Sequence, residues 1–305
     1  MIATIARHQV RSLVRQRTFV SLLGVFGVMT VLAGVLGWSS HHTIVRVYDQ
    51  AVILLDGQGR PAPPNPFTLR PRLSLLSNMV VYVPLIGALL ALVVGHLSVV
   101  DDQSGGVGRL VFSRGLDRRT YVVGKLAAAA FVLATVATMS TVISAASLLI
   151  VERTLAPSDL ARLVAFFALS WLYLMVFASI GMVSGVASRL RSLGLLSALG
   201  AWLVITFVVP QFTSGLRPTA SLNPITDPVS TSQSFFRATA KLRPLSIAEQ
   251  YKQASAHLLQ TATTHESAVR LLGHLVPIAG ALVLLAAVLI DLVGRHDYSR
   301  SASDA

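Results

Sequence analysis

Long apolar runs alternate with polar connections along the chain, and the lengths of these runs predict the fold. A helix needs about 20 mostly apolar residues to cross ~30 Å of hydrocarbon at 1.5 Å per residue. Six runs meet this length and are almost free of charge; they cover residues 18–38, 79–100, 126–151, 161–187, 193–210 and 274–293. The pattern therefore predicts an all-α integral membrane protein with six transmembrane helices in one domain over residues 1–305.

Residues 1–17 have a different pattern. Arg7, Arg11 and Arg15 recur every four residues and so share one face of a helix. Apolar side chains occupy other positions around it: Ile2, Ile5, Val10, Leu13 and Val14. This arrangement predicts a basic amphipathic helix that lies in the membrane interface. The alternative is a disordered basic tail that only sets the topology.

The distribution of basic residues predicts the orientation. With six crossings, both termini lie on one side, together with the 101–125 and 188–192 connections. These segments hold 13 of the 25 lysines and arginines, although they are only about half as long as the connections on the other side. The positive-inside rule therefore places both termini in the cytoplasm. The expected location is the cytoplasmic membrane of a bacterial cell.

Two long connections, residues 39–78 and 211–273, are predicted on the outer side. The first contains DGQGRPAPPNP, a turn-and-polyproline passage. The second begins irregularly, but Ile247, Tyr251, Ala254 and Leu258 recur at helical spacing. We expect them to form an amphipathic helix that packs on the ends of the spans.

Composition supports a membrane protein. Charged residues make up 12% of the chain, hydrophobic residues 53%, and the mean hydropathy is +0.68, whereas a soluble domain is about 25% charged. Cysteine is absent, which excludes disulfides and Cys-ligated metals. The net charge is +12, and the basic residues lie beside apolar segments. This arrangement fits binding to anionic lipid headgroups better than binding to nucleic acid.

Catalytic motifs are missing from the sequence. No G-x-S-x-G or H-E-x-x-H occurs, and Asp101 and Asp102 are adjacent, so on a helix they point about 100° apart. The stretch RTYVVGKL, residues 119–126, has Gly124–Lys125 but lacks the first glycine and the Ser or Thr of a P-loop. The chain is therefore predicted to bind no cofactor and no metal. His96 and His274 lie toward the ends of apolar runs and are interpreted as solvated or capping residues.

The 101–125 connection is longer than two spans need for a turn. It begins with Asp101 and Asp102, is interrupted by glycines, and places Leu110 and Phe112 between basic residues. We expect a short helix with an apolar patch and basic flanks, suited to the cleft of a soluble partner. The alternative is a re-entrant surface loop held against the headgroups.

Gly181 and Gly185 form a G-x-x-x-G pattern in the fourth span. Small residues at this spacing let two helices approach closely. The pair is interpreted as a helix-packing face within one subunit, with a dimer face as the alternative.

The loop and its flanks resemble the permease subunits of ABC-2-type transporters, and most closely the permeases associated with copper-site maturation of nitrous oxide reductase. That family has an acidic residue at the end of the second span, a run close to G-T-L-R-L-L-L-S-R-P-V-S-R, and Gly-Lys at the start of the third span. Residues 106–118, GVGRLVFSRGLDR, depart from this run at Val107, Gly108, Gly115 and Asp117. The identical positions are Gly106, Arg109, Leu110, Ser113, Arg114 and Arg118.

The resemblance implies a function. Two permease subunits, identical or different, would pair and dock the 101–125 loop onto two copies of a separate ABC ATPase, which would bind the ATP and magnesium. The implied ATPase-coupling residues are Asp101, Asp102, Gly106, Arg109, Leu110, Phe112, Ser113, Arg114, Arg118 and Lys125. The expected function is that of a permease subunit, moving its substrate outward. The alternative is a polytopic scaffold or regulator that recruits a cytosolic partner without transport.

Overall fold

A computed structural model describes residues 2–15, 17–61, 71–104, 117–152, 154–188, 190–213, 239–261 and 268–295. These residues form helices and turns, with no strand among them. Six helical stretches in this part of the chain are long and apolar enough to cross a membrane: Phe19–Asp56, Met79–Asp102, Arg118–Val151, Pro157–Ala187, Arg191–Thr213 and Leu271–Arg295. The prediction of an all-α protein with six membrane-spanning helices is confirmed.

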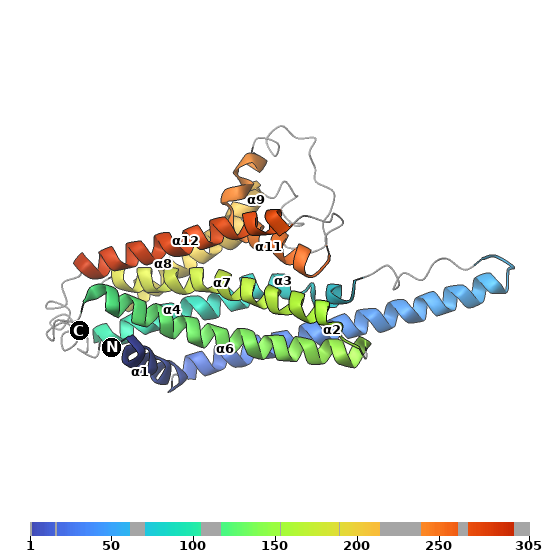
Figure 1. The fold of residues 1–305 in the computed structure, drawn as a ribbon, viewed down its shortest axis with the longest axis horizontal. Coiled ribbons are helices and arrows are strands. Elements are labelled where there is room, and N and C mark those ends of the chain that lie inside the picture. The colour runs from blue at the N-terminus through green and yellow to red at the C-terminus, as the bar shows by residue number, and fades with distance from the viewer. Residues whose placement is uncertain are drawn as a thin grey trace.

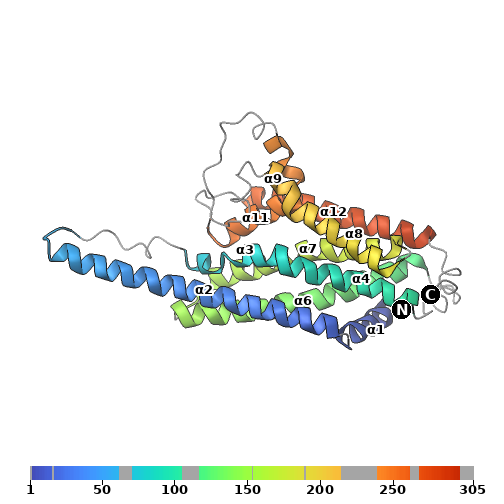
Figure 2. The ribbon, with the colours of Figure 1, turned by 180° about the vertical axis from the view of Figure 1, so that it is seen from behind.

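The spans belong to a bundle in which one helix is central (Figures 1 and 2). The helices that form the spans are α2 (Arg17–Asp56), α3 (Met79–Tyr82) with α4 (Ala88–Ser104), α6 (Arg118–Glu152), α7 (Pro157–Ala187), α8 (Arg191–Leu203) with α9 (Val209–Thr213), and α12 (Ala268–Arg295). A π-helical turn, Val83–Gly87, joins α3 to α4, and a second, Val204–Val208, joins α8 to α9.

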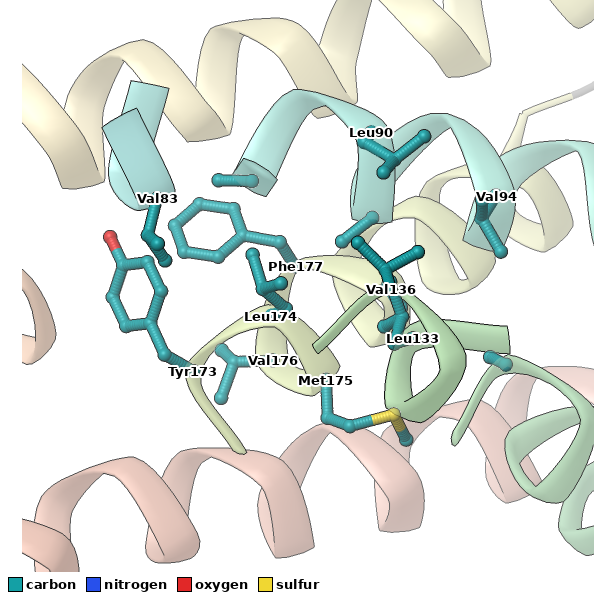
Figure 3. Packing of buried hydrophobic residues seen from close by; sticks show 14 of the residues in the cluster. Val83, Leu90, Val94, Leu133, Val136, Tyr173, Leu174, Met175, Val176 and Phe177 are labelled. Carbon is teal, nitrogen blue, oxygen red and sulfur yellow. The ribbon is translucent and has the colours of Figure 1, made fainter. Parts of the chain in front are cut away.

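Helix α7 forms the centre of the core. Leu174, Val176 and Phe177 are at most 2% exposed. Figure 3 shows this segment of α7 beside Leu90 and Val94 of α4 and Leu133 and Val136 of α6. The surrounding helices instead expose apolar side chains outward, such as Phe131, Leu196 and Val283, each 64–70% exposed. Outward apolar side chains are what a lipid-facing surface requires, because hydrocarbon solvates them as well as a core does.

Glycine sets the contact between α4 and α7, the most extensive between any two described elements. A Cβ at Gly95 would lie 1.9 Å from the carbonyl oxygen of Ala178, and a Cβ at Gly181 would lie 2.1 Å from that of Leu92. Gly185 faces His96 and Val100 of α4. The Gly181–Gly185 pair therefore lies on a packing surface within one subunit.

Several helices extend beyond the apolar runs. Helix α2 continues past the predicted boundary at residue 38 to Asp56 and projects beyond the bundle (Figure 1). No Gly or Pro interrupts residues 39–56, and the helix ends only at a turn through Gly57 and Gly59, whose φ is +65°. Part of the polyproline passage, residues 62–66, lies outside the described residues.

The N-terminal segment forms a helix, α1 (Ile2–Arg15). Arg7, Arg11 and Arg15 are exposed, while Gln9 and Leu13 are buried. Helix α1 packs mainly on α6, and it lies at the same end of the bundle as the C-terminal end of α12 (Figures 1 and 2). The basic helical face predicted for this segment is present, and its opposite face is buried against the protein.

The amphipathic helix expected in the second long connection is α11 (Ile247–Leu258), which follows a 3₁₀ turn at Ala240–Leu245 and packs against α7 and α12. Its first turn is capped by Ser246, whose hydroxyl accepts a hydrogen bond from the amide of Glu249 at 3.3 Å. Tyr251 stacks on Tyr173 of α7 with ring centroids 4.5 Å apart, and its hydroxyl lies 3.0 Å from that of Ser170. Burial raises the pKa of Tyr251, which keeps this phenol neutral.

Candidate functional site: the base of the 105–116 segment

The residues expected to couple to an ATPase fall into two groups. One group lies outside the described residues: Gly106, Arg109, Leu110, Phe112, Ser113 and Arg114. The other group, Asp101, Asp102, Arg118 and Lys125, is placed by the structure on helices rather than in a loop. Helix α4 runs through both aspartates to Ser104, and α6 begins at Arg118, so these residues form the two sides of the base from which the 105–116 segment emerges.

Lys125 is the centre of this base. Its side chain is 2% exposed, and its Nζ lies 2.8 Å from Oδ2 of Asp102. The same ammonium donates to the backbone carbonyl of Ser98 and to the side-chain oxygen of Gln9. A lysine ammonium has three N–H donors, and here each has an acceptor. A buried charge is tolerated when it is paired and hydrogen-bonded in this way.

Asp102 has a second partner. The hydroxyl of Tyr121 donates to its Oδ2 at 2.8 Å, and the Tyr121 ring centroid lies 5.4 Å from Nζ of Lys125, within cation–π range. Tyr121 and Lys125 are one turn apart on α6, so both reach the carboxylate from the same helix. Together with Gln9 and Ser98, these residues form a cluster, here called the base cluster, that joins α1, α4 and α6.

The Gly124–Lys125 pair has a structural explanation in this cluster. A Cβ at Gly124 would lie 2.9 Å from Cγ2 of Ile5, so glycine permits α1 to approach α6 at this level. That approach brings Gln9, one turn further along α1, to the ammonium of Lys125. The residues that resemble a fragment of a P-loop are therefore used in packing and ion pairing within a continuous helix.

Asp101 and Arg118 make more exposed contacts. Oδ1 of Asp101 lies 3.2 Å from Nη2 of Arg191, which ties the end of α4 to the start of α8. Arg191 is 60% exposed, and exposed ion pairs contribute about 0–1 kcal/mol. Nη1 of Arg118 lies 3.4 Å from the position of a Cβ at Gly294, so it sits beside the end of α12. These contacts gather the ends of α4, α6, α8 and α12 around the base.

The buried position of His96 shows that one interpretation from the sequence was wrong. It was expected to be solvated or to cap a helix, but it is only 4% exposed. Helix α4 continues two turns beyond it, and the missing side chains of Gly185 and Gly194 make room for its ring. His274 is half-buried, and its Nδ1 lies 2.6 Å from the side-chain oxygen of Gln250 on α11.

Three members of the base cluster were missed from the sequence: Gln9, Ser98 and Tyr121. Gln9 is the polar residue on the face of α1 opposite the arginines, and a polar residue within a buried stripe is a sign of a specific partner. Ser98 acts through its backbone carbonyl, which carries no side-chain signal.

The described residues contain no group of three or more His, Asp or Glu side chains that could hold a metal ion. What the base cluster can do is mechanical: it holds together α1 and the two helices on either side of residues 105–116, α4 and α6.

Comparison with known proteins identifies the chain at the level of the family. No curated protein matches it significantly. The family model described as ABC-2 family transporter protein matches residues 3–293, which is nearly the whole chain. Members of this family are transport subunits rather than catalytic ones and generally work with an ABC ATPase. With its six membrane-spanning helices, the chain is a multi-pass transmembrane permease subunit that belongs to the ABC-2 transporter family.

Proposed function

We propose that this permease is an exporter subunit in the bacterial cytoplasmic membrane, with both termini in the cytoplasm and with the 105–116 segment docked on a separate ABC ATPase. Two permease subunits and two ATPase subunits would form the working transporter, and the ATPase subunits would bind ATP and magnesium. The narrower resemblance, to permeases of nitrous oxide reductase maturation, stays a prediction.

The base cluster is the observation that carries the proposal. The Lys125–Asp102 pair, 2.8 Å long and buried, joins the two helices on either side of the 105–116 segment. A displacement of that segment would move the end of α4 and the start of α6 together instead of spreading them apart. Because α4 packs on α7 through glycine contacts without an intervening side chain, the movement would reach the central helix.

A separate ATPase is supported by the conformation of residues 118–126. A P-loop needs a strand, a glycine-rich turn and then a helix, so that backbone amides surround the phosphates. Here α6 begins at Arg118 and is continuous through Gly124 and Lys125, and the lysine is engaged by Asp102. These residues are not arranged to bind a nucleotide in the P-loop manner, which supports a partner subunit as the source of the energy for transport.

Replacing Leu110 and Phe112 together by aspartate is expected to abolish co-purification of the permease with its ATPase. Two carboxylates would stand where apolar side chains are expected to enter a cleft, and burying an unpaired charge is costly. The measurement is recovery of the ATPase with an affinity-tagged permease from solubilised membranes.

The matched control is Ile53→Asp with Leu54→Asp. These residues are 71% and 67% exposed, near the far end of α2, and the control should retain the ATPase. Equal recovery with both double variants would rule out docking through the 105–116 segment.

The orientation is tested by single cysteines, because the natural chain contains none. A cysteine at Ser113 should be labelled by a membrane-impermeant maleimide only after the cells are opened. A cysteine at Gln58, which lies in the turn after α2, should be labelled in intact cells. The opposite pattern would reverse the topology and contradict the proposal.

A further inference from the structure

Helix α1 has two faces with different environments. The guanidinium groups of Arg7, Arg11 and Arg15 are exposed along one face over about 12 Å, since an α-helix rises 1.5 Å per residue. The opposite face carries Gln9 and Leu13, which are 2% and 0% exposed. The face of this amphipathic helix that carries Gln9 and Leu13 is thus covered by the protein, and its basic face points away from the protein.

The place of α1 indicates what the arginine face meets. Helix α1 packs along α6 at the level of Ile5 and Gly124. Both ribbon views show α1 on the flank of the bundle, near the end at which α12 finishes (Figures 1 and 2). In a membrane protein, the flank of the bundle contacts lipid, while its tip contacts water. An arginine row on the flank near the ends of the spans lies at the depth of the lipid headgroups.

The chemistry of this row fits anionic phospholipid. The planar guanidinium fork matches phosphate oxygens in a bidentate manner, and three such groups one turn apart can each engage a different headgroup. A basic face next to a membrane surface that carries anionic lipid is attracted to it. Val14, beside this row, is 54% exposed and can enter the acyl region below the headgroups.

The buried face of α1 connects this surface to the base cluster. The side-chain oxygen of Gln9 accepts a hydrogen bond from Lys125, and Ile5 packs against Gly124. A change in the position of α1 therefore changes the partners of the ammonium that holds both sides of the 105–116 segment.

We propose that anionic phospholipid headgroups bind the arginine face of α1 and that, through Gln9 and Lys125, this binding rigidifies the base of the 105–116 segment. The permease is then sensitive to the anionic lipid content of its membrane. The lipid site itself is independent of the proposed function, and only its consequence for transport rests on ATPase coupling through this segment.

The test is hydrogen–deuterium exchange of the full chain in nanodiscs of phosphatidylcholine alone or with phosphatidylglycerol, without any ATPase present. Anionic lipid at ten times its dissociation constant should slow exchange about tenfold in α1 and in the first two turns of α6. Arg7→Gln with Arg11→Gln should lose the effect in both helices. Gln9→Leu should keep it in α1 and lose it in α6, because the link to Lys125 is removed.

The matched control is Arg46→Gln with Arg60→Gln, which removes one exposed arginine in the second half of α2 and one just after its end. This control should keep the wild-type response. Equal exchange in the two lipid compositions, or a response that survives Arg7→Gln with Arg11→Gln, would overturn the proposal. An Arg7→Gln, Arg11→Gln protein that keeps the lipid response but fails to bind the ATPase would show that the arginine face binds that protein instead, which also overturns the proposal. Because exchange is measured on the permease alone, a failure of ATPase coupling leaves this result unaffected.

Discussion

Replacing Lys125 by methionine is expected to lower the free energy of unfolding by about 3–5 kcal/mol, because it leaves a buried carboxylate without its counter-ion. Asp102 would keep only the hydrogen bond from Tyr121, and the acceptors on Gln9 and Ser98 would lose their donor. Denaturant or thermal unfolding in detergent, followed by tryptophan fluorescence or circular dichroism, measures the change.

Two control experiments accompany this prediction. Adding Asp102→Leu to Lys125→Met should recover part of the loss, since a pair removed together leaves no isolated charge. Arg295→Met removes a surface partner of Asp291, where both side chains are more than half exposed, and should change stability by less than about 1 kcal/mol. If the Lys125→Met protein were as stable as the Arg295→Met protein, the base cluster would be solvated by water and would not stabilise the contact between its helices.

Replacing Gly95 by alanine is expected to destabilise the protein by about 3 kcal/mol, at the upper end of the cost of overpacking. The new Cβ would lie 1.9 Å from the carbonyl oxygen of Ala178, and backbone cannot move aside as a side chain can. Helices α4 and α7 would have to separate along their whole contact. The midpoint of thermal unfolding reports the effect, and a weakened α4–α7 contact should also reduce ATP-dependent transport.

The same substitution at Gly280 is the matched control. Beyond its chain neighbours and the backbone of its own helix, nothing lies within 4 Å of the Cβ position there, and the residue is in the middle of α12. Alanine is a better helix former than glycine by about 1 kcal/mol, so Gly280→Ala should leave stability unchanged or raise it. A loss of stability at Gly280 as large as that at Gly95 would show that helix propensity or insertion, rather than the α4–α7 contact, controls the response.

Both predictions concern contacts that turn six separate spans into one mechanical unit. At its closest points the α4–α7 contact brings a glycine against a backbone carbonyl, and its rigidity comes from backbone against backbone. The base cluster has the opposite character, with an ammonium that satisfies acceptors from two helices besides its own. Under the proposed function, the cluster would receive the movement of the ATPase and the glycine contact would pass it to the core.

The number of spans, the helical class and the basic face of α1 could be predicted from the sequence, because each depends on local composition. A run of apolar residues long enough to cross the hydrocarbon must pair its own backbone groups and so becomes a helix, whatever its neighbours are. The spacing of Arg7, Arg11 and Arg15 likewise determines which face they share. The family resemblance also rested on local sequence patterns, among them residues 106–118.

The tertiary structure alone decided which of these helices touch. Lys125 was expected in a loop that contacts a partner, yet α6 begins earlier and buries it against Asp102 of α4 and Gln9 of α1. His96 was expected near water, yet glycines on α7 and α8 give its ring a buried place. Gly95 belongs to no recognisable sequence motif, although a Cβ at this position would clash with the backbone of α7. The partners of Lys125 are 23 and 116 positions away along the chain, so this pairing depends on which helices become neighbours and at which level they cross. No local pattern determines that choice, because hydrocarbon solvates every apolar helix face equally well before the helices meet.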